Sequence, residues 1–372
     1  MKNLAIYQIL IDRFWGDISL PQSENMFMGG NIQGVISKLE YIQNMGFNTI
    51  YLSPFNTTTN YHGYHIEDYF AVDPHFGTTE DIVELIDKAH KMGLKLMMDF
   101  VPNHCSVEHP LFKEAISDPK SRYREWFYIE DDGSYKMFLD FDILPKFNLQ
   151  NRECADYLIS SCKYWCELGF DYVRVDHAIG TPFEFLKRLT REVKEVNSSI
   201  KVYGEIWAQG LKRKFFNTVY LKSRVKKYIF GIDQETIQMD YIDVIDGLLD
   251  FKFAEIIRKG IMRGDMKALR SALSKHFAKY PANFDLILML DNHDTNRFLF
   301  EAGQDRKKLL AAIKVMVEQN HSYSIYYGTE SAMSNSEDIF RGVDYADLQV
   351  RLPLQFSEPQ LMGEISKIVR KE

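Results

Sequence analysis

Short apolar runs alternate with longer helical patterns along most of this chain. The apolar runs are rich in β-branched residues, which is typical of strands buried on both faces. The clearest helical pattern is Thr79–Met92, where Thr78 and Asp81 are spaced for a capping box and Gly93 follows the last turn. We predict strands at Leu4–Ile11, Asn48–Leu52, Leu94–Val101, Phe170–Val175, Ile200–Gly204, Gly247–Phe251, Asp285–Leu290 and Tyr323–Tyr327. We predict further helices at Ile32–Met45, Glu153–Leu168, Pro182–Val196, Asp305–Gln319 and Gln360–Arg370.

About eight successive strand–helix units predict an α/β fold with a parallel sheet, and this number favours closure into a TIM (β/α)8 barrel over an open doubly wound sheet. No GxGxxG sequence follows an early strand, which counts against a dinucleotide-binding fold. Residues 102–150 are rich in Pro, Asp, Tyr and Phe and show no clean period, so we predict a short inserted domain there, between strand 3 and helix 3. The barrel then comprises residues 1–101 and 151–372. We expect no C-terminal β-sandwich, because few residues follow Tyr327.

Composition and charge narrow the functional classes. The chain has 372 residues, of which 45% are hydrophobic, and its net charge of −7 provides no basic surface for nucleic acid or anionic membranes. The N-terminal apolar run holds Gln8 and continues into Asp12 and Arg13, which indicates a strand rather than a secretion signal, and no run approaches the length of a membrane span. The four cysteines fit no zinc or disulfide template, so we expect reduced, partly buried thiols and a cytoplasmic location.

Polar side chains end four of the predicted strands. They are Asp99, Asn103 and His104 after the third strand, Arg174 and Asp176 at the fourth, Glu205 and Trp207 at the fifth, and His293 and Asp294 at the seventh. Charges in a buried parallel strand are costly unless they are paired, and barrel enzymes carry their chemistry at the carboxyl ends of the strands. Two carboxyl groups on adjacent strands, with a third facing them, suit glycoside cleavage, which needs an ionised nucleophile and a protonated acid. Arg174 lies on the same face of its strand as Asp176 and is expected to keep that carboxyl ionised.

These residues resemble the signature segments of the α-amylase family of glycoside hydrolases (glycoside hydrolase family 13). The matching segments are Asp99–His104 (DFVPNH), Gly169–Asp176 (GFDYVRVD), Tyr203–Trp207 (YGEIW) and Asp291–Asp294 (DNHD), with further likeness at Gly29–Gly34 (GGNIQG) and His62–Tyr64 (HGY). The similarity runs from about residue 4 to about residue 330, in the family's order.

The resemblance implies a retaining α-glycoside hydrolase that cleaves α-glucosidic bonds of malto-oligosaccharides or related small α-glucans by double displacement. Asp176 is then the nucleophile, Glu205 the general acid and base, and Asp294 the stabiliser of the transition state. The substrate-binding residues that we assign are Tyr64, stacked beneath the sugar, and His104, Arg174, His293 and Trp207.

No cofactor is required for this chemistry, and we assign no metal ligand. In many family members a histidine four residues after the nucleophile helps to hold calcium, beside the asparagine that matches Asn103. Here that position is Gly180, so the usual site is incomplete and calcium binding is left open. Leu144–Asn148 (LPKFN) resembles an element typical of the neopullulanase and cyclomaltodextrinase subgroup, whereas His65 and the His177–Gly180 segment match no subgroup.

Three alternatives stay open at the level of sequence. A glucanotransferase or transglycosylase would use the same covalent intermediate and differ only in whether water or sugar reaches it. A catalytically inactive sugar-binding homologue is disfavoured because all three carboxyl groups and Arg174 are present. A barrel enzyme for phosphorylated metabolites is disfavoured because no glycine-rich phosphate loop lies near the last strands. The substrate is expected to be a small α-glucan, with no nucleic acid or membrane partner, and the oligomeric state is not predicted.

Overall fold

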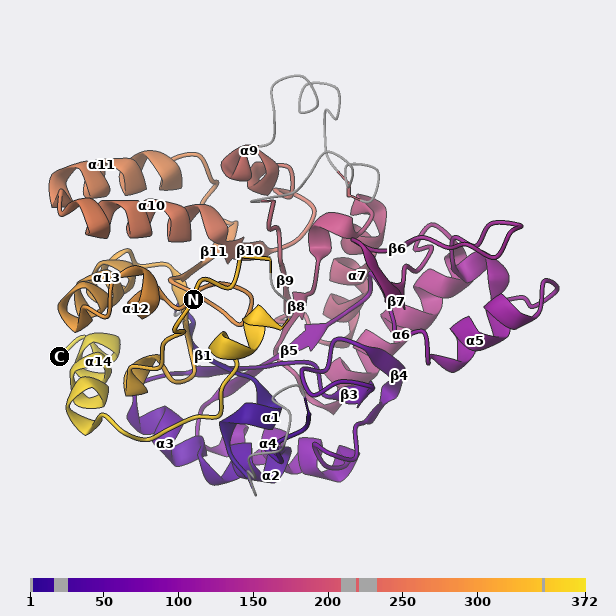
Figure 1. Cartoon of the computed structure of the whole chain (residues 1–372), viewed down its shortest axis with the longest axis horizontal. Coiled ribbons are helices and arrows are strands. Elements are labelled where there is room, and N and C mark those ends of the chain that lie inside the picture. The colour runs from indigo at the N-terminus through magenta and orange to yellow at the C-terminus, as the bar shows by residue number, and fades with distance from the viewer. Residues whose placement is uncertain (1–2, 17–25, 209–218, 221–232, 343–344) are drawn as a thin grey trace. The chain divides into compact units, whose positions relative to one another are not determined.

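Parallel strands form a closed barrel in the computed structural model (Figure 1). The structure describes residues 3–16, 26–208, 219–220, 233–342 and 345–372. The barrel strands are β1 (Ala5–Ile9), β2 (Thr49–Leu52), β5 (Lys95–Phe100), β8 (Tyr172–Val175), β9 (Lys201–Gly204), β10 (Gly247–Asp250), β11 (Asp285–Met289) and β12 (Ser322–Tyr326). Their order around the barrel is β1-β12-β11-β10-β9-β8-β5-β2, so neighbours follow the chain with one closure between β1 and β12. The predicted (β/α)8 architecture is confirmed.

The chain forms two compact units. One comprises Met1–Ser53, His75–Met97 and Leu249–Glu372, and the other comprises Pro54–Pro74 and Met98–Leu248. The predicted division between a barrel and an inserted domain at residues 102–150 stays a prediction, as does the expected lack of a C-terminal β-sandwich.

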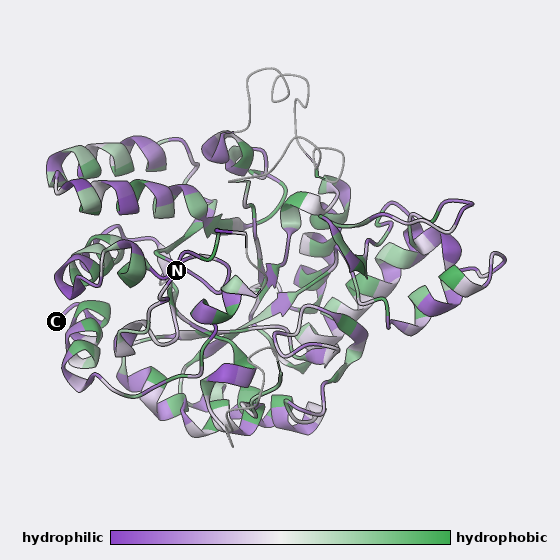
Figure 2. Cartoon of the chain, viewed as in Figure 1, coloured by the Kyte–Doolittle hydropathy of each residue, from purple (hydrophilic) through white to green (hydrophobic). Residues whose placement is uncertain are grey.

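Amphipathic helices accompany the strands. They are α1 (Ile11–Phe14), α2 (Ile32–Ser37), α3 (Leu39–Asn44), α4 (Thr79–Lys91), α5 (Pro110–Ser117), α6 (Arg152–Leu168), α7 (Phe183–Val196), α9 (Gln234–Met239), α10 (Phe251–Arg263), α11 (Met266–Phe277), α12 (Phe298–Glu301), α13 (Arg306–Glu318) and α14 (Pro359–Arg370). In α4 the predicted capping box is present: the Thr78 hydroxyl accepts from the Asp81 N–H, and the Asp81 carboxylate accepts from the Thr78 N–H. The buried residues of α4 share one face, and Figure 2 shows apolar and polar stretches alternating along such helices.

The single helix predicted at Ile32–Met45 is instead two short helices, α2 and α3. The chain leaves helical geometry at Lys38, whose φ is −110° and ψ is 7°. Close packing explains the glycine in α2, because a Cβ on Gly34 would stand 1.7 Å from the Trp15 carbonyl oxygen. A periodic apolar pattern continues across the break, which is why the sequence alone did not show it.

The aperiodic stretch at residues 102–150 contains α5, a 3-10 turn η1 (Arg124–Trp126) and a hairpin of β6 (Met137–Phe138) and β7 (Phe141–Pro145). Aromatic rings pack against one another in this stretch, as between Phe127 and Phe147, whose ring centroids are 5.0 Å apart. A second hairpin, β3 (Asn56–Thr58) with β4 (Ile66–Val72), has an irregular register, so it left no clear alternation in the sequence.

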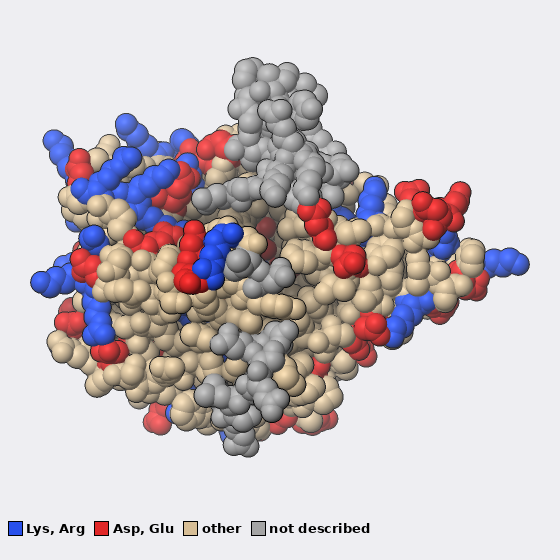
Figure 3. All heavy atoms as spheres, in the orientation of Figure 1, with Lys and Arg blue, Asp and Glu red and all other residues tan. Residues whose placement is uncertain are grey.

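The cysteines, the hydropathy of the helices and the surface charges can be compared with what composition predicted. All four cysteines are buried and free, as expected, and burial raises the pKa of the Cys105, Cys154 and Cys162 thiols. Within the described ranges no helix has both the length and the apolar character needed to cross a bilayer. In Figure 3, acidic and basic side chains are interspersed, with lysines and arginines gathered over α10 and α11. Several of these are paired; Glu255, for example, binds both Lys252 and Lys259.

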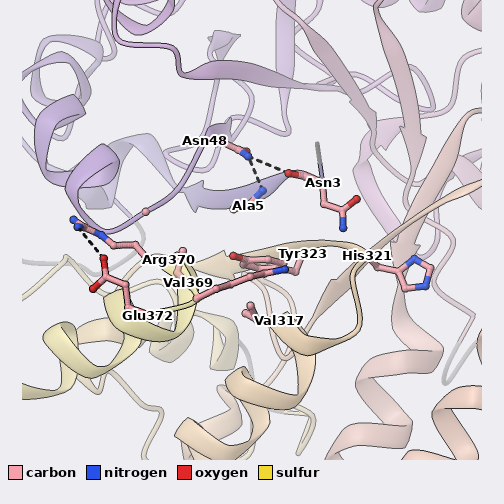
Figure 4. A pocket seen from close by; sticks show the side chains of 11 residues that line it. Asn3, Ala5, Asn48, Val317, His321, Tyr323, Val369, Arg370 and Glu372 are labelled. Atoms are coloured by element: carbon pink, nitrogen blue, oxygen red, sulfur yellow. Dashed lines mark hydrogen bonds and ion pairs between the residues drawn. The ribbon is translucent and has the colours of Figure 1, made fainter. Parts of the chain in front are cut away.

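A hollow of about 450 Å³ lies at the amino ends of β1 and β12 (Figure 4). Asn3, Asn48, His321, Tyr323 and Arg370 are among its lining residues. No residue that the sequence predicts for catalysis or sugar binding is among the residues that line this hollow.

Candidate active site

Arg174 is the centre of a cluster of carboxyl groups in the unit that contains β8 and β9. Its Nη1 lies 2.6 Å from Asp99 Oδ1 and 2.8 Å from Asp176 Oδ1, and its Nη2 lies 2.9 Å from Glu205 Oε1. Arg174 is fully buried, and Asp176 and Glu205 are each only 7% exposed. One guanidinium therefore holds both proposed catalytic carboxyl groups, as the alternation of β8 predicted for Asp176.

Backbone hydrogen bonds position these two carboxyl groups at neighbouring strand ends. The Asp176 N–H donates to the Phe100 carbonyl oxygen at 2.8 Å, and the Glu205 N–H donates to the Val175 carbonyl oxygen at 3.0 Å. The parallel ladder thus continues one residue past β8 and one past β9. Both side chains leave the backbone at the same edge of the sheet because parallel strands end together.

Glu205 has a second contact, from the turn that follows the proposed nucleophile. The His177 N–H donates to Glu205 Oε2 at 2.9 Å. His177 has a φ of 40°, a left-handed conformation that is uncommon outside glycine and that directs its N–H to Glu205. The turn continues into the 3-10 turn η2 (Ala178–Gly180).

Tyr64 and His104 lie in the same unit. The Tyr64 hydroxyl donates to Asp99 Oδ2 at 2.8 Å, and its ring centroid is 6.0 Å from the Arg174 guanidinium carbon. Tyr64 is half-buried, so part of its ring stays available for another group. His104 is buried, and burial lowers its pKa to about 3, so its imidazole is neutral at ordinary pH and can donate or accept a hydrogen bond.

His293 and Asp294 belong to a second cluster, in the unit that contains β11. Gln8 Nε2 lies 2.9 Å from His293 Nδ1, and because the amide nitrogen is a donor, Nδ1 accepts and the ring proton is assigned to Nε2. His293 Nε2 then lies 3.1 Å from Asp294 Oδ2. Arg351 Nη2 lies 2.8 Å from Asp294 Oδ1.

The structure therefore brings the predicted residues together in two groups. Arg174, Asp176, Glu205 and Tyr64 form the first, joined by Asp99, and His293 with Asp294 forms the second. His104 lies in the same unit as the first cluster, and its Nδ1 is 3.2 Å from Asn103 Nδ2. Trp207 is half-buried and lies three residues beyond β9.

Three functional candidates were not assigned a role from sequence. Asp99 was noted as a strand end, but its contact with both Arg174 and Tyr64 depends on the fold. Gln8 had a signal, since it is the one amide in an apolar strand run. Arg351 had no such signal, because it directly follows the 3-10 turn η5 (Ala346–Val350) and lies 57 residues after Asp294.

The described residues do not fit a calcium site of the kind implied by the resemblance. No group of three or more His, Cys, Asp or Glu side chains placed to bind a metal occurs within the described ranges. Calcium takes six to eight oxygen ligands, usually with carboxylates among them. At Gly180 the carbonyl oxygen accepts a hydrogen bond from Lys146 Nζ at 2.9 Å, so an ammonium group stands beside the oxygen that a metal would need.

Comparisons with known proteins identify the family of this chain. The catalytic-domain model of the α-amylase family matches residues 8–136 and 128–362. "Alpha-amylase 2" of Dictyoglomus thermophilum is 36% identical over 376 residues, covering 100% of this chain and 62% of its own length. A cyclomaltodextrinase from a Bacillus species is 30% identical over 91% of this chain and 61% of its own length.

A solved structure extends the likeness to three dimensions. The α-amylase of Geobacillus thermoleovorans, complexed with acarbose, aligns with a TM-score of 0.81 at 28% identity over 99% of this chain and 78% of that one. The chain spans about three fifths of the length of the two curated relatives above. With the family model matched over most of its length, the chain belongs to the α-amylase family.

Proposed function

We propose that this protein is a retaining α-glycoside hydrolase that cleaves α-glucosidic bonds of malto-oligosaccharides or related small α-glucans. The observation that carries the proposal is the guanidinium of Arg174, which binds Asp176 and Glu205 at adjacent strand ends. A retaining glycosidase needs two neighbouring carboxyl groups, one as nucleophile and one as acid and base. The acarbose complex of one relative and the name of another, a cyclomaltodextrinase, support the substrate class.

Asp176 acts as the nucleophile in this mechanism. The Arg174 contact favours its ionised form, so the carboxylate attacks the anomeric carbon and the bond to the leaving oxygen breaks. Glu205 gives its proton to that oxygen. Water then enters, gives a proton back to Glu205, and releases Asp176 from the glycosyl ester.

The charge of the cluster explains how Glu205 serves first as an acid and then as a base. Asp99, Asp176 and Glu205 share one guanidinium, so ionisation of all three leaves an excess of negative charge within these four side chains. That excess favours a proton on one carboxyl group. Formation of the ester removes the charge of Asp176, and Glu205 then loses its proton more readily, as a base must.

The other predicted residues take binding roles. Tyr64 supplies a half-buried ring for stacking, and the neutral His104 supplies a hydrogen bond to a sugar hydroxyl. Asp294 stabilises the positive charge that develops on the sugar ring, with His293 beside it, and Trp207 provides a further aromatic surface. No cofactor takes part in any of these steps. The buried free cysteines support the predicted cytoplasmic location.

Two substitutions test the catalytic roles. Asp176→Asn is expected to abolish turnover while thermal unfolding stays unchanged, with Asp87→Asn on the exposed face of α4 as the matched control. Residual activity within about tenfold of the parent would show that the nucleophile is misassigned. Glu205→Gln is expected to impair maltotriose cleavage far more than cleavage of an activated aryl α-glucoside, whose leaving group needs no proton.

Product analysis tests the stereochemistry and the competing activity. Proton NMR of a fresh reaction should show the α-anomer first, and initial β-anomer would exclude retention. Chromatography of products from maltotriose, pullulan, β-cyclodextrin and sucrose identifies the bond and the substrate. Products longer than maltotriose would indicate a glucanotransferase, whereas no turnover on the whole panel would indicate a sugar-binding protein.

A further inference from the structure

Lys146 is a buried lysine in the LPKFN element, close to the proposed nucleophile yet unused by the mechanism above. It is only 4% exposed. Its backbone forms an antiparallel bridge with His104, and its N–H donates to the Lys136 carbonyl oxygen at 2.9 Å. On the next residue, the Phe147 N–H donates to the Asn103 carbonyl oxygen at 3.1 Å. The backbone thus fixes where the Lys146 side chain begins.

The side chain ends at the turn that follows Asp176. Lys146 Nζ donates to the Gly180 carbonyl oxygen, the last residue of η2, at 2.9 Å. The ammonium group also lies 5.8 Å from the centroid of the Tyr220 ring, at the outer limit of a cation–π contact. The Tyr220 N–H in turn donates to the Ile179 carbonyl oxygen at 2.8 Å, so the carbonyl group belongs to η2 and the ring is bound to it.

The surroundings of Gly180 favour a positive charge but leave no room for a side-chain metal ligand. A Cβ on Gly180 would stand 2.3 Å from His177 Cδ2 and 2.6 Å from Asn103 Oδ1, so a histidine fits there only if both neighbours shift. Asn103 Oδ1 is buried and lacks a hydrogen-bond donor among the described residues. Two acceptor oxygens therefore lie near this point, and the cation that reaches it is an ammonium group.

The nearby imidazoles of His104 and His177 do not supply the positive charge beside the Gly180 carbonyl. Burial, with a smaller contribution from the charge of Lys146, lowers the pKa of His177 far below its ordinary value and that of His104 to about 3. Both rings are therefore neutral, and the positive charge that faces the Gly180 carbonyl is that of Lys146. The ring of Phe138 packs against both, 4.5 Å from His104 and 4.7 Å from His177 between centroids.

We propose that the Lys146 ammonium group is a built-in cation that stands in this chain where many α-amylases bind calcium. It links the LPKFN element to η2, and η2 in turn follows the left-handed His177, whose N–H contacts Glu205 Oε2. Lys146 is a positioning residue, since it acts on Glu205 through the turn. A divalent ion at this point would be repelled by the ammonium group, and the part of the chain that the structure describes offers it no cluster of carboxylate ligands.

The first experiment uses wild-type protein and thermal unfolding, so it does not depend on the proposed function. If Lys146 occupies this point, calcium does not bind beside Asn103 and Gly180. Neither excess calcium nor a calcium chelator should then change the Tm of the wild-type protein through this site. A calcium-dependent rise in Tm that Asn103→Ala abolishes would overturn the proposal. A rise that survives Asn103→Ala would place the calcium elsewhere and agree with it.

The second experiment removes the charge and keeps the stem. Lys146→Met should lower Tm by about 2–4 °C, because a buried carbonyl and the turn behind it lose their partner, whereas Lys120→Met on the exposed surface should have no effect. An unchanged Tm for Lys146→Met would overturn the proposal. If Lys146→Met does not fold, the calcium measurement on the wild type still decides.

A kinetic measurement separates positioning from general stability, and this part rests on the proposed function. At a temperature where Lys146→Met is folded, its kcat should fall about tenfold more on maltotriose than on an activated aryl α-glucoside, because only the former needs the proton of Glu205. Equal losses on both substrates would show that Lys146 does not act through Glu205, whatever the outcome of the stability measurements.

Discussion

Two arginines hold the proposed catalytic carboxyl groups, and they do so in different ways. Arg174 extends from the middle of β8 and contacts three carboxyl groups, Asp99, Asp176 and Glu205. Arg351 approaches Asp294 from a turn after β12, and it also binds Asp347 at 2.6 Å and, through Nε, the His293 carbonyl oxygen at 2.9 Å. The Asp294 side chain is 27% exposed, compared with 10% for Asp176.

The difference in burial determines what each arginine contributes. A buried charge is stable only if nearby groups compensate for its lost hydration. Removing Arg174 therefore leaves two or three buried carboxyl groups without a cationic partner. Deleting Arg351 leaves Asp294 with solvent and with His293 as partners. We therefore expect Arg174 to be needed for both folding and catalysis, and Arg351 for catalysis mainly.

Arg174→Met should have the largest effect. It leaves Asp99, Asp176 and Glu205 without their shared cation, which should lower the free energy of unfolding by about 3–5 kcal/mol and kcat/KM at least roughly 1000-fold. Urea unfolding and initial rates on maltotriose measure the two losses. Arg191→Met, on an exposed arginine of α7, is the control, and a stable Arg174→Met would contradict the assigned difference between the arginines.

Arg351→Met should have the second largest effect. It removes a charge-assisted hydrogen bond to Asp294, which corresponds to a loss of about 1.5–3 kcal/mol in transition-state stabilisation, or roughly 10- to 100-fold in kcat/KM. The free energy of unfolding should fall by about 1–2 kcal/mol, less than for Arg174→Met, because a buried carbonyl loses its donor while the Asp294 carboxylate stays partly solvated. Arg341→Met, on an exposed arginine, is the control. If Arg351→Met lowered the free energy of unfolding as much as Arg174→Met, the proposed difference between the two arginines would be wrong.

The acid sensitivity of the two regions should differ because of His104. Its folded pKa of about 3 lies below the ordinary value of about 6.5, so the unfolded state binds more protons between these values and stability rises with pH across that window. At pH 5 the protein should be about 2 kcal/mol less stable through this residue than at pH 8. Urea unfolding of His104→Gln should lack that part of the loss, whereas the exposed His90→Gln should keep it.

Gln8→Leu should have the smallest effect. It removes the donor that fixes the His293 tautomer, a neutral hydrogen bond of about 0.5–1.5 kcal/mol, so kcat/KM should fall roughly two- to tenfold. Steady-state rates measure the loss. A loss as large as that of Arg351→Met would mean that the β1 contact, and not the arginine, controls the second cluster.

Part of this picture was predictable from local sequence. The barrel strands followed from β-branched apolar runs, and α4 from its capping box, because both signals lie within a few residues of one another. The break between α2 and α3 was not predicted, since the apolar period continues through Lys38. The hairpin of β3 and β4 was missed because its shifted register removes the alternation that would mark a strand.

The candidate site divides in the same way. Sequence alone indicated Arg174 as the partner of Asp176, since residues two apart share a face of a strand. Only the tertiary structure determined that the same guanidinium reaches Asp99 and Glu205, that Arg351 binds Asp294, and that Lys146 ends on Gly180. The side-chain alternation of a strand can be seen in adjacent residues of the sequence. These contacts, in contrast, join segments that are tens of residues apart. They exist because parallel strands closing into a barrel bring their carboxyl ends, and the loops after them, to one edge.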